Sequence, residues 1–215
     1  GAVGVQLGGS AAPGITPVPH QVEWGETWYW SFTERSIRRL LTGTSVYRED
    51  EVRVSGSPRL DLVASSATDR DRVRTELGVA PDERLVVISG TWGTLSRRFH
   101  YPIALASLFD RSLPDVHLVV KLHPGEPDEG PYRAVIEGVA AARGFEPPPM
   151  SFVQDVDLYR LLRAADAHIG VQSTVLTEAV VAGTPNLLAA TAAASDLLGY
   201  VAAGVAIEVR TGADL

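Results

Sequence analysis

The chain has 215 residues, no cysteine and a formal net charge of −7, with 45% hydrophobic and 21% charged residues. This size and apolar content suit one globular domain, or one domain and part of another. The acidic balance argues against a nucleic-acid partner, no apolar run reaches the ~18 residues that a membrane helix needs, and the lack of cysteine fits a reducing compartment. We therefore expect a cytoplasmic protein without a transmembrane segment, and a place at the inner face of the membrane stays open.

The first part of the chain has few regular elements. Strands are predicted near 1–6, 21–25 and 51–54 and a helix over 33–41, which is too little to close a core. The segment 55–61 (SGSPRLD) has the Gly and Pro of a linker. We therefore expect residues 1–56 to be the end of an upstream α/β domain with an interdomain linker, and residues 57–215 to be a separate domain.

Helical and strand patterns alternate through the rest of the chain. Helices are predicted over 69–77, 101–109, 132–143, 157–165, 175–182 and near 195–201. Strands are predicted over 84–89, 116–122, 152–153, 166–170, 187–190 and 205–209. The strands are continuous apolar runs, which is typical of a parallel sheet covered on both faces. The predicted fold is α/β, a Rossmann-like doubly wound parallel sheet.

The segment 164–185 (AADAHIGVQSTVLTEAVVAGTP) combines a strand, a polar turn and a helix. The turn, Gln172, Ser173 and Thr174, lies at a helix N-terminus and at the carboxyl end of a strand, where an anion is favoured and open α/β sheets bind ligands. Helix capping alone would also account for the two hydroxyls. However, the capping-box partner is missing, and Glu178 is a charge inside an otherwise apolar helix that needs a partner.

Two further turns should meet this one at the same sheet edge, because each follows a parallel strand. The first, Gly90-Thr91-Trp92-Gly93, lacks the Lys and Ser or Thr of a P-loop, and its glycines could simply make the turn. Arg97 follows it and could reach a phosphate or be a solvated surface residue. The second turn begins at His123, whose imidazole at a strand exit can donate to a phosphate, and Lys121 precedes it on the strand.

Other chemically notable residues favour structural roles. His117 and His168 are mid-strand and are more often core histidines. The Asp155-Val-Asp157 segment has the D-x-D form of some metal-binding sugar transferases, but it directly precedes a helix, so capping is favoured. We expect no metal site and find no nucleophile with a supporting triad.

The motifs resemble, in order and context, the nucleotide-binding C-terminal half of GT-B fold glycosyltransferases. The likeness is greatest to bacterial surface-polysaccharide transferases and CDP-glycerol glycerophosphotransferases. The matching segments are VRVSGSPRLD (52–61), LVVISGTWG (85–93), VVKLHPGE (119–126), DLYRLLRAADAHIG (157–170) and QSTVLTEAVVAGTP (172–185). The resemblance implies a glycosyl- or glycerophosphotransferase domain for surface-polysaccharide or teichoic-acid-type polymers. It implies a CMP/CDP- or UDP-type donor, and a glycan or polyol-phosphate acceptor.

The resemblance also implies roles for individual residues. His123, Ser173 and Thr174 would hold the donor phosphates, Glu178 would bind the ribose or an adjacent group, and the loop from Gly90 to Gly93 would face the cleft. Most members need no metal, since the helix dipole and positive side chains stabilise the leaving nucleotide, and we expect no cofactor. The catalytic base stays unknown, because it would come from the acceptor domain.

Two other functional classes remain as alternatives. Non-hydrolysing UDP-sugar 2-epimerases share the fold, but their Asp-Ser-Gly-Gly turn is absent at 172–174. A non-catalytic GT-B-like module is the third class. This alternative remains because Leu7 stands at the position where the family's Gln-His-Gly loop has histidine. The difference argues against a catalytic role for that loop.

Overall fold

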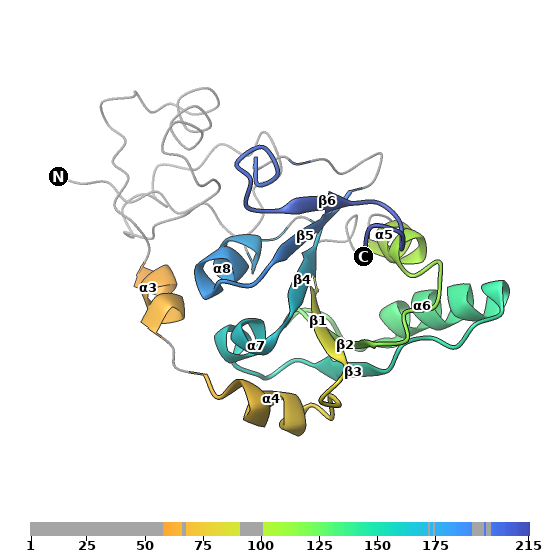
Figure 1. The fold of residues 1–215 in the computed structure, drawn as a ribbon, viewed down its shortest axis with the longest axis horizontal. Helices are drawn as coiled ribbons and strands as arrows, with labels where there is room; N and C mark the ends of the chain where they lie inside the picture. Colours follow the sequence, from red (N-terminus) through yellow and green to blue (C-terminus); the bar gives the residue numbers. More distant parts are fainter. Residues whose placement is uncertain are drawn as a thin grey trace.

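The computed structural model describes residues 58–65, 68–90, 101–171, 173, 175–190, 196 and 199–215. Within them, six strands form one parallel sheet in the order β3-β2-β1-β4-β5-β6 (Figure 1). The strands are β1 (Arg84–Ser89), β2 (Val116–Lys121), β3 (Met150–Val153), β4 (Ala167–Gly170), β5 (Asn186–Ala189) and β6 (Ile207–Val209). The chain winds outward from β1 to β3, returns to the centre, and winds outward again from β4 to β6. This is the doubly wound Rossmann-like order, so the predicted fold class is confirmed.

Helices cover both faces of the sheet (Figure 1). One face carries α4 (Arg70–Glu76), α7 (Leu158–Ala164) and α8 (Val175–Ala182), and the other carries α5 (Tyr101–Leu108) and α6 (Gly130–Arg143). Helix α3 (Pro58–Ser65) lies outside α8 and packs against it. Leu85 and Val87 of β1 pack in the cluster with α4 and α7, whereas Ile88 packs with α5 and α6. Because both faces are buried, the central strands are continuously apolar.

Local signals set the helix ends. Asp157 accepts N–H hydrogen bonds from Tyr159 (2.9 Å) and Arg160 (3.2 Å), so it caps α7. Capping was the favoured interpretation of the D-x-D segment, and no three metal-binding side chains cluster within the described ranges. Gly144 ends α6 in the left-handed conformation (φ 77°), which glycine adopts without steric cost. The predicted helices between residues 69 and 182 agree with the observed ones to within one or two residues.

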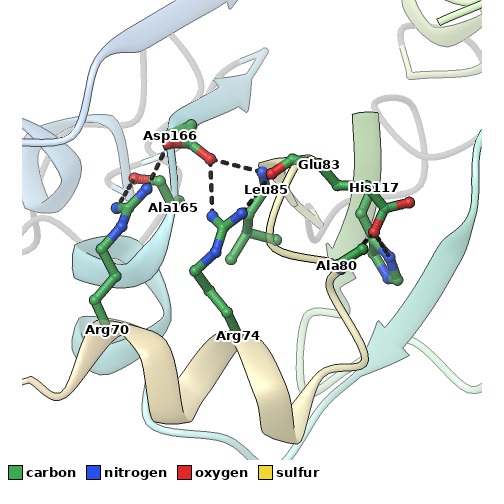
Figure 2. A network of polar contacts seen from close by, with 8 residues as sticks. All are labelled: Arg70, Arg74, Ala80, Glu83, Leu85, His117, Ala165 and Asp166. Atoms are coloured by element: carbon green, nitrogen blue, oxygen red, sulfur yellow. Dashed lines mark hydrogen bonds and ion pairs between the residues drawn. The ribbon is translucent and has the colours of Figure 1, made fainter. Parts of the chain in front are cut away.

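A polar network joins β1 and β4 at their amino-terminal ends (Figure 2). The Asp166 carboxylate accepts hydrogen bonds from the Leu85 N–H (2.8 Å), from Arg74 (2.9 Å) and from Arg70, both arginines coming from α4. Burial opposes ionisation of Asp166, but the Leu85 N–H and the two arginines outweigh it and lower its pKa. The network therefore fixes α4 at the edge opposite the turns of interest.

Two predictions differ from the structure. Residues 58–61, expected to be linker, begin helix α3, since proline is tolerated in a first helical turn. Arg163 of α7 donates to the carbonyls of Val63 (2.7 Å) and Ala64 (3.0 Å), which holds the end of α3 on the domain. Where a helix was expected near 195–201, residues 200–204 form a turn, and the described positions 196 and 199 are not helical.

The remaining N-terminal predictions lie outside the described residues. They are the strands at 1–6, 21–25 and 51–54, the helix over 33–41, and the domain boundary at 56/57. None of the helices in the described part of the chain has the length and apolar content that a membrane crossing requires.

Candidate functional site

The carboxyl ends of β2, β1 and β4 lie side by side at one edge of the sheet. The register pairs Ser89 with Lys121 on β2, and Ile88 with Ile169 on β4. Because the strands are parallel, the turns that follow them all leave at this edge. The winding of the chain reverses between the neighbouring strands β1 and β4, and open α/β sheets bind ligands at the carboxyl edge of such a point. The structure therefore brings Gly90 and the turn that begins at His123 to the same edge as Ser173.

The turn that begins at His123 has a defined geometry. The Gly125 N–H donates to His123 Nδ1 at 3.0 Å, so a neutral imidazole carries its proton on Nε2. This tautomer is assigned from the hydrogen bond. Gln154 Nε2 donates to the carbonyls of His123 and Glu126, each at 2.9 Å. Nε2 of His123 is thus a hydrogen-bond donor on a turn whose backbone is held in place.

Glu126 is a residue of this edge to which the sequence analysis gave no role. It is only 5% exposed. One carboxylate oxygen accepts the His123 N–H at 2.6 Å, and the other accepts the Tyr132 hydroxyl at 2.7 Å. In the sequence Glu126 is the first residue of an acidic segment, 126–129, whose other residues are mostly exposed. It was therefore not distinguished from surface carboxylates. The signal that could have revealed it is its spacing of three residues from His123, from which a carboxylate can reach back to a backbone N–H.

Gly90 has no room for a side chain. Its N–H donates to the Lys121 carbonyl at 2.7 Å. A Cβ at this position would lie 2.1 Å from a carboxylate oxygen of Glu126 and 2.8 Å from the backbone nitrogen of His123. Glycine is needed here because two segments of backbone approach closely, which differs from the turn-making role considered from the sequence. The next candidates along the chain, Thr91, Gly93 and Arg97, lie outside the described residues.

Lys121 ends β2 beside these groups. Its ammonium donates to the Leu122 carbonyl at 2.8 Å. Burial lowers the pKa of Lys121, while the carboxylates of Asp155 and Glu126 act in the opposite direction. Lys121 is therefore a partly desolvated cation at the carboxyl edge of the sheet.

Ser173 caps the first turn of α8. Its hydroxyl oxygen accepts the Val175 N–H at 3.2 Å, and its carbonyl accepts the Leu176 N–H at 3.2 Å. The capping interpretation therefore describes what this hydroxyl does in the structure. The N-terminus of α8 still faces the carboxyl edge of the sheet. Gln172 and Thr174 lie outside the described residues.

Glu178 lies in the first turn of α8 and is 3% exposed. Its charge acts on Tyr200, whose hydroxyl is hydrogen-bonded to Thr177 at 2.7 Å. Burial, together with the charges of Asp196 and Glu178, raises the pKa of Tyr200, against the effect of the Thr177 bond. Glu178 is thus buried in this helix, while its contact with a ribose stays a prediction.

A buried chain of hydrogen bonds runs beneath this edge. His168 Nε2 lies 2.9 Å from the Ser89 hydroxyl, and its Nδ1 lies 2.8 Å from the Asn186 side-chain oxygen. Asn186 in turn donates to the Leu176 carbonyl of α8 at 2.7 Å. Burial lowers the pKa of His168 to about 4, and the Asn186 bond opposes this only in part. His168 is a satisfied core histidine, as predicted, and it links the end of β1 to α8.

His117 is also a core residue, as predicted. It is buried on β2, with Nε2 at 2.9 Å from the Ser151 hydroxyl and Nδ1 at 3.4 Å from a carboxylate oxygen of Glu83 (Figure 2). These partners lie near the amino-terminal edge, away from the turns.

The sheet order defines the class of protein as a Rossmann-like α/β domain, the architecture of one half of a GT-B fold. A protein-family model matches residues 23–168, about two thirds of the chain, and its description is CDP-Glycerol:Poly(glycerophosphate) glycerophosphotransferase. The chain belongs to this family, which is a transferase family.

Solved structures share the fold. WaaG, a glycosyltransferase involved in lipopolysaccharide biosynthesis, is 17% identical with a TM-score of 0.53, over 84% of this chain and 48% of that chain. The UDP-GlcNAc 2-epimerase of Neisseria meningitidis bound to UDP-GlcNAc is 16% identical with a TM-score of 0.53, over 89% and 51%. The wall teichoic acid polymerase TagF is 15% identical with a TM-score of 0.50, over 99% and 54%.

These similarities show the fold alone, and the chain spans about half the length of each of the three structures. A comparison with curated protein sequences found no match.

Proposed function

We propose that the chain is the donor-binding half of a glycerophosphotransferase. It would bind CDP-glycerol, from which glycerol phosphate passes to a poly(glycerophosphate) acceptor held by another part of the protein. The observation that carries the proposal is the family match, which extends from residue 23 to 168 and includes β1, β2 and the His123 turn. Teichoic-acid-type polymers have this acceptor chemistry.

This reaction requires mainly that the donor and acceptor be positioned and that positive potential surround the donor phosphates. A hydroxyl of the acceptor attacks the phosphorus that bears glycerol, the bond from that phosphorus to the bridging oxygen breaks, and CMP leaves with the electron pair. The hydroxyl proton passes to a base, which we assign to the acceptor-side domain. Negative charge grows on the leaving phosphate, so donors fixed beforehand around it lower the barrier.

The carboxyl edge of the sheet has groups suited to this task. His123 offers an Nε2–H donor, the N-terminus of α8 contributes backbone N–H groups and the positive end of its dipole, and Lys121 adds a cation. We assign the donor phosphates to His123, Ser173 and Thr174.

Around these phosphate ligands, Gln172, Arg97 and the loop from Gly90 to Gly93 would line the site, and Glu178 would face the ribose. We place the reaction in the cytoplasm, at the inner face of the membrane.

Affinity for a nucleotide panel tests the proposal. CMP, CDP, CDP-glycerol, UMP, UDP and GDP would be titrated by calorimetry and thermal shift, because ligands of the native state raise its melting temperature. We expect the cytidine nucleotides to bind best. His123→Ala should weaken binding about tenfold or more, the value of one hydrogen bond to a charged group, whereas His123→Gln keeps a donor and should stay within about threefold. Absence of binding at millimolar concentration, or equal affinity of His123→Ala and the unchanged chain, would refute the assignment.

The epimerase alternative is tested by product analysis. The fold of the Neisseria enzyme is similar, so fold alone does not separate the two activities. An epimerase converts a UDP-sugar without an acceptor, and we expect no such conversion. A non-catalytic module would bind none of the nucleotides.

A further inference from the structure

The Glu126 carboxylate is enclosed by three separate parts of the fold. One oxygen binds the His123 N–H at 2.6 Å, the other binds the Tyr132 hydroxyl of α6 at 2.7 Å, and Gly90 at the end of β1 leaves no space for even a methyl group beside it. Tyr132 is itself fixed, because its ring packs edge-on against Tyr101 of α5 at 6.1 Å. The position of this carboxylate is therefore determined by the sheet and by both helices of one face.

The same carboxylate controls the backbone of His123. Its N–H is held by Glu126, and its carbonyl is held by Gln154 at 2.9 Å. Hydrogen bonds to a carboxylate are shorter and roughly twice as strong as bonds between neutral groups, so Glu126 is the stronger of the two restraints. Being almost fully buried, Glu126 is placed to act on a ligand at this edge through the position of His123, while its charge also acts on the neighbouring Lys121.

Burying a carboxylate is costly, and a purely structural turn has cheaper solutions, such as a serine or asparagine side chain. We propose that Glu126 is the positioning residue of the donor site. Its carboxylate fixes His123 against Gly90 and so sets the direction in which the imidazole donates to the donor phosphate. This inference rests on the proposed function, since it concerns the same site.

The test compares substitutions at Glu126 with a control of similar structural cost elsewhere. Glu126→Ala removes both acceptor oxygens, and Glu126→Gln keeps one acceptor for the His123 N–H. The control is Thr184→Val, because the buried Thr184 hydroxyl donates to the Leu162 carbonyl at 2.7 Å near the amino-terminal end of β5, far from the turns. The double variant His123→Ala with Glu126→Ala closes a thermodynamic cycle.

Two readouts separate positioning from stability. The first is the amide proton shift of His123 in a nitrogen–proton correlation spectrum, recorded without ligand. It should move in Glu126→Ala and stay unchanged in Thr184→Val. The second is CDP affinity, measured well below every melting temperature. Loss of one oriented hydrogen bond predicts weakening of about tenfold in Glu126→Ala, about threefold or less in Glu126→Gln, and no change in Thr184→Val.

The cycle decides whether Glu126 acts through His123. In the His123→Ala background, Glu126→Ala should weaken CDP binding by less than about twofold, because the group that it orients is already gone. Equal weakening in both backgrounds, or unchanged affinity of a folded Glu126→Ala protein, would overturn the inference while nucleotide binding itself stands. No binding by the unchanged chain would overturn the proposed function and this inference with it.

If Glu126→Ala fails to fold, Tyr132→Phe replaces it. This change removes only the hydroxyl that holds the second carboxylate oxygen, so weakening of CDP binding that disappears in the His123→Ala background is again the expected result. Weakening that persists there would overturn the inference.

Discussion

Protonation of His168 should make the fold acid-sensitive well above the pH at which carboxylates titrate. The imidazole is fully buried between the Ser89 hydroxyl and the Asn186 amide, and both contacts suit its neutral form. Its pKa is lowered by burial from 6.5 to about 4 in the folded chain. The perturbation that isolates this effect is His168→Gln, which keeps a hydrogen-bonding side chain but does not titrate.

The sign and size follow from proton binding in the two states. Between pH 4 and 6.5 the unfolded chain binds a proton at His168 that the folded chain excludes, so stability rises with pH and is lost as the pH falls. The full loss is about 3 kcal/mol, and about 2 kcal/mol of it should appear between about pH 7.5 and about pH 5.

Urea unfolding followed by circular dichroism at these two pH values measures the effect. We expect the advantage of the unchanged chain over His168→Gln to shrink by about 2 kcal/mol on acidification, which is about 1 M in the urea midpoint for a slope near 2 kcal/mol/M. Other titrating groups contribute equally to both proteins and cancel in the difference. Parallel pH profiles for the two proteins would refute the argument that His168 is buried in its neutral form.

Four further substitutions have defined outcomes. Gly90→Ala should destabilise by about 1–3 kcal/mol through overpacking against Glu126, whereas Gly138→Ala, on an open face of α6, should stabilise by about 0.5–1 kcal/mol, both seen as melting temperatures. Asp157→Ala should cost about 1 kcal/mol of unfolding free energy by loss of the α7 cap, with nucleotide affinity unchanged in calorimetry. Asp166→Asn should cost about 2 kcal/mol at neutral pH. Because the pKa of Asp166 is lowered, this difference should fade in urea titrations only as the pH falls below about 4.

Much of the sheet was predictable because its signals are local. Strand β1 was predicted over 84–89 and forms Arg84–Ser89, since an apolar run lies between a charged turn and Gly90. The parallel order then placed the turns after β1, β2 and β4 at one edge without further information. Helix α3 was missed because its short sequence, 58–65, has little apolar periodicity and is held by Arg163, a residue of α7.

The contacts inside the candidate site could not be predicted from the sequence in the same way. Gln154 reaches the His123 carbonyl across 31 residues, and Tyr132 reaches Glu126 from helix α6, so neither contact leaves a pattern in the sequence. Gly90 was recognised as a loop glycine, but what excludes a side chain there is the Glu126 carboxylate and the backbone of His123 packed against it. For Ser173 the sequence left two roles open, because a hydroxyl that caps a helix and one that binds an anion have the same sequence signature. The structure shows the capping contact.

Lys121 also gives the site a built-in chemical handle. It is the single lysine of this chain, and the other 18 of the 19 lysine and arginine residues are arginine. Because burial lowers its pKa, more of its amine is unprotonated and nucleophilic at neutral pH than for an ordinary surface lysine. An amine-selective reagent would therefore modify one side chain, at the edge of the sheet where the donor is proposed to bind. The rate of that modification becomes a covalent footprint of occupancy that needs no engineered label.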